Sequence, residues 1–122
     1  MARAEQTYSG DALEERLAAM AGWTHAGGAI ERTYTTDGWP TTIMLVNAIA
    51  FIAEAADHHP DLAVSWGRVT VRLNTHSAGG ITDKDFELAQ SIERQALWRP
   101  AGGALDGTTR KWVSGGTPKP TA

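Results

Sequence analysis

The feature that most constrains the fold is the segment from Glu54 to Asp85, where the sequence pattern changes from helical to extended and back to helical. An apolar helical segment must end near Asp57, because Pro60 disfavours helical geometry in the residue before it. Two strands are predicted next, over Asp61–Trp66 and Arg68–Thr75. This order of elements indicates a fold in which helices pack against a sheet.

The second of these strands has the clearest pattern. Its apolar residues Val69, Val71 and Leu73 alternate with polar residues, which predicts one buried face and one solvated face. A tight loop over residues 78–80 follows, and Thr82 with Asp85 forms a capping-box pattern that opens a third helix. The inner face of that helix is predicted to contain Phe86, Ala89, Ile92 and Ala96.

Upstream, residues 1–8 are expected to be loose, and Ser9 or Asp11 is expected to cap a first helix. Gly22 is the expected stop signal. The apolar stripe of this helix consists of Leu13, Leu17 and Met20, at helical spacing.

A β-hairpin is predicted next, because Gly27 and Gly28 separate two extended segments, residues 23–26 and 29–35. A glycine pair supplies the positive φ angles of a two-residue turn. Asp37 is the expected cap of a second helix, with Pro40 in its first turn, where the missing N–H costs little.

The second helix is apolar on two sides and therefore needs two partners. We expect its first face to cover the sheet and its second to contact another subunit. The first face comprises Trp39, Ile43, Val46, Ala50 and Ala53, and the second comprises Leu45, Ala48, Ile52 and Ala55.

The composition changes after Trp98 to a Gly-, Thr- and Pro-rich stretch without a period. We expect one domain over residues 1–98 and a C-terminal arm over 99–122, anchored by Trp112 and frayed at its end. The element order predicts an α+β fold with a four-stranded antiparallel sheet and three helices on one face (α-β-β-α-β-β-α). Its uncovered sheet face or edges favour oligomerisation.

Composition excludes several classes of function. The chain of 122 residues has no cysteine, so thiolate zinc sites and cysteine nucleophiles are excluded. With a net charge of −3 and no basic block, we expect no nucleic-acid partner. The apolar run from Ile43 to Ala53 is too short to span a bilayer, and the N-terminus lacks the apolar core of a secretory signal. We therefore expect a cytoplasmic protein without a membrane partner.

Three histidines in the central segment, His58, His59 and His76, are candidates for proton transfer. Imidazole titrates near pH ~6.5, so it can give and take protons at neutral pH. His76 follows the end of a strand, where functional loops are common. Glu54 and Asp57 lie one helical turn or less before the pair and could fix an imidazole tautomer or raise its basicity.

Other interpretations of these residues stay open. Asp85 is in a position where a carboxylate caps a helix. Zinc can bind three histidines, but the adjacent pair His58-His59 lacks the spacing that points two ligands the same way. Trp23 and Trp66 suit a core or a subunit contact better than a ligand platform. A serine hydrolase is disfavoured because the chain has no G-x-S-x-G elbow.

The central segment resembles the pterin-4a-carbinolamine dehydratase family, which has an acidic residue before His-His-Pro, then an aromatic residue, a histidine and an aspartate. Here the corresponding residues are Glu54, His58-His59-Pro60, Trp66, His76 and Asp85. The run Asn74-Thr75-His76 is similar to the family's Ser/Thr-Thr-His, with Asn in its first place. The resemblance covers about residues 7–97.

This resemblance implies dehydration of a 4a-hydroxytetrahydropterin to the quinonoid dihydropterin, as in tetrahydrobiopterin recycling. His58 and His76 would be the acid–base pair, His59 would bind and orient the pterin, and Glu54 and Asp85 would support them. The segments 57–59 (Asp57, His58 and His59) and 74–77 (Asn74, Thr75, His76 and Ser77) would line the pterin. The pterin is the substrate, so no metal or redox cofactor is expected.

Three other roles are compatible with the same fold. One branch assembles the carbon-fixing carboxylase of carboxysomes, but there the His-His pair is replaced, whereas here it is intact. Animal members also act as dimerisation cofactors for a transcription factor. A dehydratase-like protein of molybdopterin metabolism would keep the histidines, so the sequence does not separate it from the main interpretation.

Overall fold

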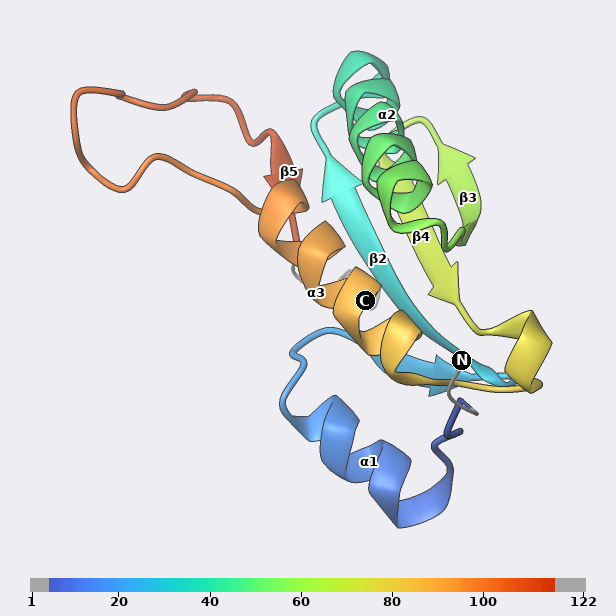
Figure 1. Ribbon diagram of the computed structural model, residues 1–122. Coiled ribbons are helices and arrows are strands. Elements are labelled where there is room, and N and C mark those ends of the chain that lie inside the picture. The colour runs from blue at the N-terminus through green and yellow to red at the C-terminus, as the bar shows by residue number, and fades with distance from the viewer. Residues whose placement is uncertain (1–4, 116–122) are drawn as a thin grey trace, which may run out of the picture.

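The computed structural model describes residues 5–115, which form an antiparallel sheet covered on one face by helices (Figure 1). The strand order is β1-β2-β4-β3, with a short β5 paired to β2. The predicted α+β class, its element order and its four-stranded core are confirmed. The strands are β1 (Thr24–Ala26), β2 (Ala29–Thr36), β3 (Asp61–Ser65), β4 (Arg68–Leu73) and β5 (Val113–Ser114). The helices are α1 (Gly10–Ala18), α2 (Trp39–Ala56), α3 (Asp83–Ala96) and the short 3₁₀ turn η1 (His76–Ala78).

The central strands β2 and β4 follow the predicted alternation. Val69, Val71 and Leu73 of β4 are fully buried under the helices. The opposite face is polar: Thr33 and Thr70 share a hydrogen bond of 2.9 Å across the strands, and Arg72 pairs with Glu31 at 3.1 Å. One buried face and one solvated face are therefore observed, as the sequence predicts.

The predicted glycine turn and the predicted capping box are both present. Gly27 and Gly28 have φ angles of +54° and +79°, which close the β1–β2 hairpin. At the start of α3, the Thr82 hydroxyl accepts from the Lys84 N–H, and the Asp85 carboxylate accepts from the Thr82 N–H. This reciprocal arrangement satisfies backbone donors that the first helical turn leaves free.

A buried polar cluster centred on Glu93 joins α3 to β2. Its carboxylate accepts from both Nε and Nη2 of Arg32, at 3.0 and 2.8 Å. It also accepts from Trp23 Nε1 and from the Tyr34 hydroxyl, the latter at 2.6 Å. Burial raises the pKa of Tyr34 well above its usual range, so the hydroxyl remains a donor to Glu93. The Glu93 carboxylate thus accepts four hydrogen bonds, two of them from the buried Arg32 guanidinium. Such bonds compensate the cost of removing the Arg32 charge from water.

The predicted faces of α2 are wrong in part, although Ala53 is buried on the core side as expected. Leu45, which we expected on the subunit face, is buried against the core together with Ile49. Trp39 and Ala50, expected to cover the sheet, are exposed. Thr41 and Thr42 are buried and hydrogen-bonded, so the inner face begins with polar residues. Because the helix is apolar all round, hydropathy could not define its orientation.

Much of α2 is left uncovered by the chain itself. Phe51 is 78% exposed and Met44 is 54% exposed, although both are large and apolar. Among the described helices, α2 alone is long and apolar enough to cross a membrane by length and composition. A core helix of a soluble protein meets the same test, so this finding is weak evidence for a membrane span.

The predicted caps of α1 and α2 also differ from those observed. Ser9 is at the N-cap of α1, but its side chain makes no capping hydrogen bond. Gly38, and not Asp37, is the N-cap of α2, with φ +147°, a conformation that glycine favours. The Asp37 carboxylate instead accepts from the Thr41 hydroxyl at 2.5 Å and from Arg110 Nε at 2.6 Å.

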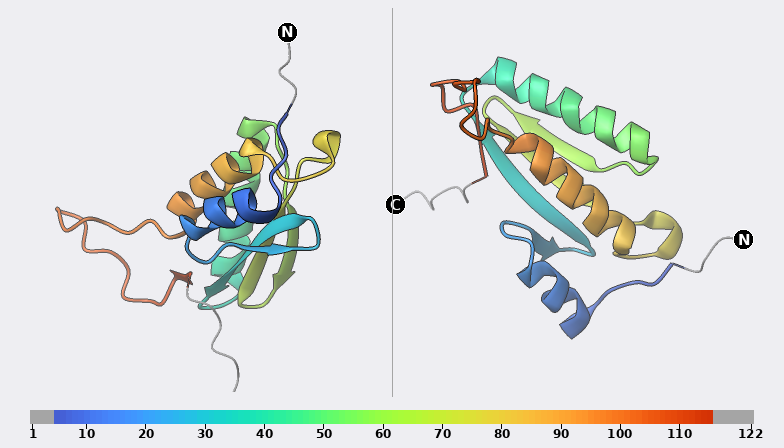
Figure 2. Two further views of the ribbon diagram at one scale, coloured as in Figure 1. Left: turned by 90° about the horizontal axis from the view of Figure 1, so that it is seen from below. Right: turned by 60° about the vertical axis from the view of Figure 1, so that its left-hand side comes forward.

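The C-terminal segment leaves the body of the molecule as a long loop and returns to it (Figure 2). On its return, Thr35 and Thr36 of β2 pair with Ser114 and Val113 of β5, which adds a fifth strand that the sequence pattern did not predict. Trp112 packs against the core, as expected of the aromatic anchor. The predicted fraying of the last residues lies outside the described residues.

The N-terminal residues 5–8 are packed, contrary to the expectation that they are loose. The Tyr8 N–H donates to the carbonyl oxygen of Ile81 at 2.8 Å, and the Tyr8 ring meets Phe86 edge to face. The Tyr8 hydroxyl donates to Asp83 at 2.8 Å. These partners are more than seventy residues away in sequence, so no local pattern could reveal them.

Candidate active site

The candidate site begins where α2 ends. Asp57 adopts a left-handed conformation (φ 53°, ψ 42°) that stops the helix, and aspartate tolerates this region better than most residues. The His58 N–H still donates to the carbonyl oxygen of Ala53 at 3.2 Å. The chain therefore leaves the helix abruptly, and the side chains of His58 and His59 acquire different partners.

His58 is the inner histidine. Its Nε2 lies 2.6 Å from Oδ1 of Asp85, and the side chains are 13% and 0% exposed. Asp85 is in the first turn of α3, so this contact connects the end of one helix to the start of another. Within residues 5–115, no buried side-chain nitrogen or oxygen lacks a hydrogen-bond partner.

Asp85 caps α3 and also contacts His58. Its Oδ2 accepts from the Thr82 N–H and from the Thr75 hydroxyl, both at 2.9 Å. Its Oδ1 is left for His58. An ionised carboxylate only accepts hydrogen bonds, so these contacts assign the Nε2–H tautomer to neutral His58. The Nδ1 atom of His58 is then the nitrogen with a free lone pair.

His59 is the outer histidine and pairs with Glu54. Its Nε2 lies 2.8 Å from Oε1 of Glu54, and both side chains are exposed, at 57% and 83%. Glu54 thus contacts one of the predicted histidines, as an orienting carboxylate would. Asp57, the other predicted orienting residue, makes no described contact with a histidine.

The third predicted histidine, His76, is exposed at the start of η1, directly after Thr75. No contact in the described part of the chain joins it to His58 or His59. Its connection to the pair runs through its neighbour, because the Thr75 hydroxyl bonds Asp85, and Asp85 bonds His58. Asn74 is half-buried beside Thr75, and the Ser77 hydroxyl contacts Glu5 at 3.3 Å.

Trp66, the aromatic residue of the resemblance, does not join this group. It lies in the β3–β4 turn and is 69% exposed. Its ring is near Gly38, at the opposite end of α2 from His58, and its carbonyl oxygen accepts from Thr42. The structure therefore excludes the core position that we considered for this tryptophan, and places it away from the histidines.

A cavity of about 390 Å³ lies between the end of α2 and α3, and His58 and Asp57 contribute to its wall. The other lining residues are Ile52, Ala56, Lys84, Glu87, Leu88 and Ser91. His59 and His76 are not among them. Sequence reasoning missed Lys84, Glu87 and Ser91, although their spacing of three and four residues places them on one side of α3. This polar side of α3 could have been recognised from the sequence, since the apolar inner face of the helix was already predicted.

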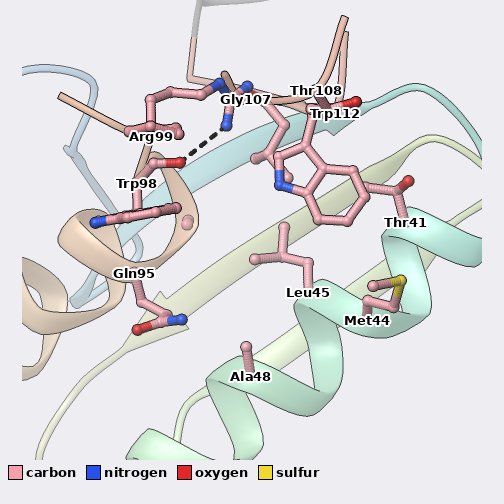
Figure 3. Close-up of a pocket in the computed structure, with 13 residues that line it drawn as sticks. Thr41, Met44, Leu45, Ala48, Gln95, Trp98, Arg99, Gly107, Thr108 and Trp112 are labelled. Atoms are coloured by element: carbon pink, nitrogen blue, oxygen red, sulfur yellow. Dashed lines mark hydrogen bonds between the residues drawn. The ribbon is translucent and has the colours of Figure 1, made fainter. Parts of the chain in front are cut away.

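A second cavity, of about 430 Å³, lies at the other end of α2 and is lined on one side by the C-terminal segment (Figure 3). Trp98 and Trp112 line it together with Leu45, Met44 and Ala48, which lie on α2 below the two tryptophans in this view. It contains no histidine and no carboxylate, so it offers no acid–base chemistry. In residues 5–115 no cluster of three or more histidine or carboxylate side chains is arranged to hold a metal ion.

Comparisons with known proteins point in one direction. The family described as pterin 4 alpha carbinolamine dehydratase matches residues 6–95. A protein of Roseiflexus sp. (strain RS-1), provisionally named a pterin-4-alpha-carbinolamine dehydratase, is 48% identical over 66% of this chain and 87% of its own length. A protein of Aquifex aeolicus with the same provisional name is 47% identical, over 70% of this chain and 86% of its own.

Two solved structures are similar in fold. One, described as a transcriptional coactivator/pterin dehydratase from Brucella melitensis, has a TM-score of 0.68 and 30% identity, covering 72% of this chain and 96% of its own. The other is a pterin dehydratase-like protein identified as a RuBisCO assembly factor in the alpha-carboxysome. It has a TM-score of 0.56 and 15% identity, covering 64% and 93%, and this likeness concerns the fold alone.

Proposed function

The chain belongs to the pterin 4 alpha carbinolamine dehydratase family, and from this premise we propose that it dehydrates a 4a-hydroxytetrahydropterin to the quinonoid dihydropterin. The observation that carries the proposal is the His58–Asp85 pair, in which a buried carboxylate 2.6 Å from the ring fixes the imidazole at the mouth of a cavity. Such a pair can hold one ring nitrogen ready for proton transfer.

The reaction needs two proton movements and no change of oxidation state. The hydroxyl group leaves C4a as water and therefore takes up a proton, while N5–H loses one. With Nε2–H of His58 directed at Asp85, its Nδ1 would face the pterin. His58 and His76 form the proposed acid–base pair, and each positioned acid or base is expected to contribute on the order of ~10²–10⁴-fold.

The remaining predicted residues have supporting parts in this proposal. His59, oriented by Glu54, would bind and orient the pterin from the solvent side. Asp57 and the run Asn74–Ser77 would line it, with backbone groups recognising its amide edge. Thr75 supports this arrangement because its hydroxyl ties the end of β4 to Asp85. No metal or redox cofactor has a part in the proposed reaction.

We also propose that the protein acts in the cytoplasm as a homodimer or homotetramer assembled through α2. The support is the exposed apolar side chains Met44 and Phe51, on a helix of which only 28% of the residues are buried. Exposed apolar surface of this kind marks protein–protein contacts in soluble proteins.

The deciding experiment is an absorbance assay of 4a-hydroxytetrahydropterin breakdown, with and without the protein. Acceleration above the spontaneous rate by the wild type supports the proposal, and a rate equal to the spontaneous one contradicts it. Activity should survive exhaustive chelation, whereas its loss would indicate a metal site.

A further inference from the structure

The N-terminal strap, residues 5–8, lies against the loop after β4 and the start of α3. Glu5 binds two partners through one carboxylate. Its Oε1 is 2.5 Å from Nζ of Lys84, and its Oε2 accepts from the Ser77 hydroxyl at 3.3 Å. The Glu5 side chain is 25% exposed, so it is partly enclosed by these contacts.

The strap is fixed independently of Glu5. The backbone bridge between Tyr8 and Ile81 pairs it with the residue that precedes Thr82. Asp83 receives hydrogen bonds from the Tyr8 hydroxyl at 2.8 Å and from Arg16 at 2.7 Å. The Arg16 guanidinium also lies 4.3 Å from the centre of the Phe86 ring. Glu5 is therefore held in place from α1, the loop and α3 together.

Both partners of Glu5 belong to the proposed substrate site. Lys84 lines the cavity that contains His58, and Ser77 ends the run Asn74–Ser77. The hydrogen bond from Lys84 is the main cause that lowers the pKa of Glu5, and the hydrogen bond from Ser77 contributes a smaller lowering. The pKa of Lys84 is raised, mainly by its hydrogen bond to Glu5 and further by Asp57 and Asp85.

We propose that Glu5 is a positioning residue of the dehydratase site, which holds the Lys84 ammonium at the cavity wall and Ser77 in the loop after β4. An ammonium has three N–H donors, so Lys84 keeps donors for an oxygen of the pterin while it is bound to Glu5. Glu5 lies directly before residues 6–95, which match the family model. The inference rests on the proposed function, because it assigns Glu5 to that same site.

The test is Glu5→Gln, with Glu15→Gln as the matched control. Both changes remove one negative charge, but Glu15 is on the exposed side of α1 and makes no described contact. Glu5→Gln should raise KM for 4a-hydroxytetrahydropterin roughly 3- to 10-fold, the range expected for the typical net contribution of one hydrogen bond. Its kcat should change less than about twofold, because Glu5 does not touch the reacting atoms.

A double-mutant cycle with Lys84→Gln separates positioning from general damage. If Glu5 acts through Lys84, Glu5→Gln should raise KM much less in the Lys84→Gln background than in the wild type. An equal rise in KM in the two backgrounds, or an unchanged KM in Glu5→Gln, would overturn the inference. Turnover by the wild type would still uphold the proposed function in that case. A wild type that neither turns over the substrate nor binds 7,8-dihydrobiopterin would overturn both.

Discussion

Asp85 lies 2.6 Å from His58 through Oδ1, while its Oδ2 accepts the Thr82 N–H that begins α3. One carboxylate thus joins the cap of a helix to the orientation of an imidazole. Because Asp85 is fully buried, no water can replace either contact without rearrangement.

Asp85→Asn should therefore impair both stability and turnover. The amide cannot accept from His58, Thr75 and Thr82 with the strength of a carboxylate, and its N–H₂ group faces donors. We expect a loss of about 1–3 kcal/mol in the free energy of unfolding, and a large fall in kcat. Urea unfolding and the pterin assay measure the two effects, and Asp83→Asn is the neighbouring control. Unchanged kcat in the folded variant would contradict the role of the pair.

His58→Ala and His76→Ala should each lose most activity and remain folded. Their expected loss is on the order of ~10²–10⁴-fold in kcat, the usual contribution of a positioned acid or base. His25 is exposed on β1 and is not among the proposed site residues, so His25→Ala is the control and should keep full activity. Full activity in both variants of the pair would remove these residues from the mechanism.

Asp37 should make the attachment of the C-terminal segment sensitive to acid. Hydrogen bonds from Thr41 and Arg110 lower its pKa in the folded protein. A carboxyl group whose pKa is lowered by folding stabilises the fold at pH values above its unfolded pKa of about 3.9. This contribution is lost as the pH falls through the pKa of the folded state. The protection factor of the Val113 amide against hydrogen exchange should therefore fall in this acidic range, and Asp37→Asn should show low protection already at neutral pH. Slow exchange in that variant would show that β5 holds without the ion pair.

Phe51→Glu should disrupt the proposed assembly without unfolding the protein. The side chain is 78% exposed in the single chain, so a charge there costs little in the monomer but much in an apolar contact. Light scattering during gel filtration should show a smaller species than the wild type. Leu105→Glu, at an exposed position outside α2, is the matched control. The same mass for Phe51→Glu and the wild type would place the interface elsewhere.

Glu93→Gln should be among the most destabilising single changes. It leaves the Arg32 guanidinium, which is 6% exposed, without its carboxylate. Breaking one partner of a buried ion pair costs about 3–5 kcal/mol, and the partial exposure of Glu93 places the expected loss near ~3 kcal/mol. Urea unfolding measures it, with Glu87→Gln on the exposed side of α3 as control. A loss below ~1 kcal/mol would show that the charge is not needed there.

The sequence predicted those elements whose cause is local. The alternation of Val69, Val71 and Leu73, the glycine turn at Gly27-Gly28 and the Thr82–Asp85 capping box each depend on neighbouring residues, and all three are observed. The orientation of α2 was wrong because a helix that is apolar all round gives no period to interpret. Two buried threonines, Thr41 and Thr42, decide it instead.

The candidate site was predictable only in part, for a related reason. The resemblance identified His58 and Asp85, which the structure brings into contact across 27 residues of sequence. Lys84 and Glu5 were missed, because their pairing depends on how the N-terminal strap folds back over α3. The roles of His59 and His76 stay predictions. His59 contacts Glu54, whereas no described contact joins His76 to the other histidines.

The pairing of β5 with the far end of β2 has a consequence for biosynthesis. Thr35 and its partner Ser114 are separated by 79 positions. During synthesis, β5 can therefore pair with β2 only after residues 113–114 have left the ribosome. The nascent protein must meanwhile rely on the four-stranded sheet and the Arg32–Glu93 cluster. The proposed site residues, from Glu54 to Asp85, all precede the arm in the chain, so they can come together before β5 pairs with β2.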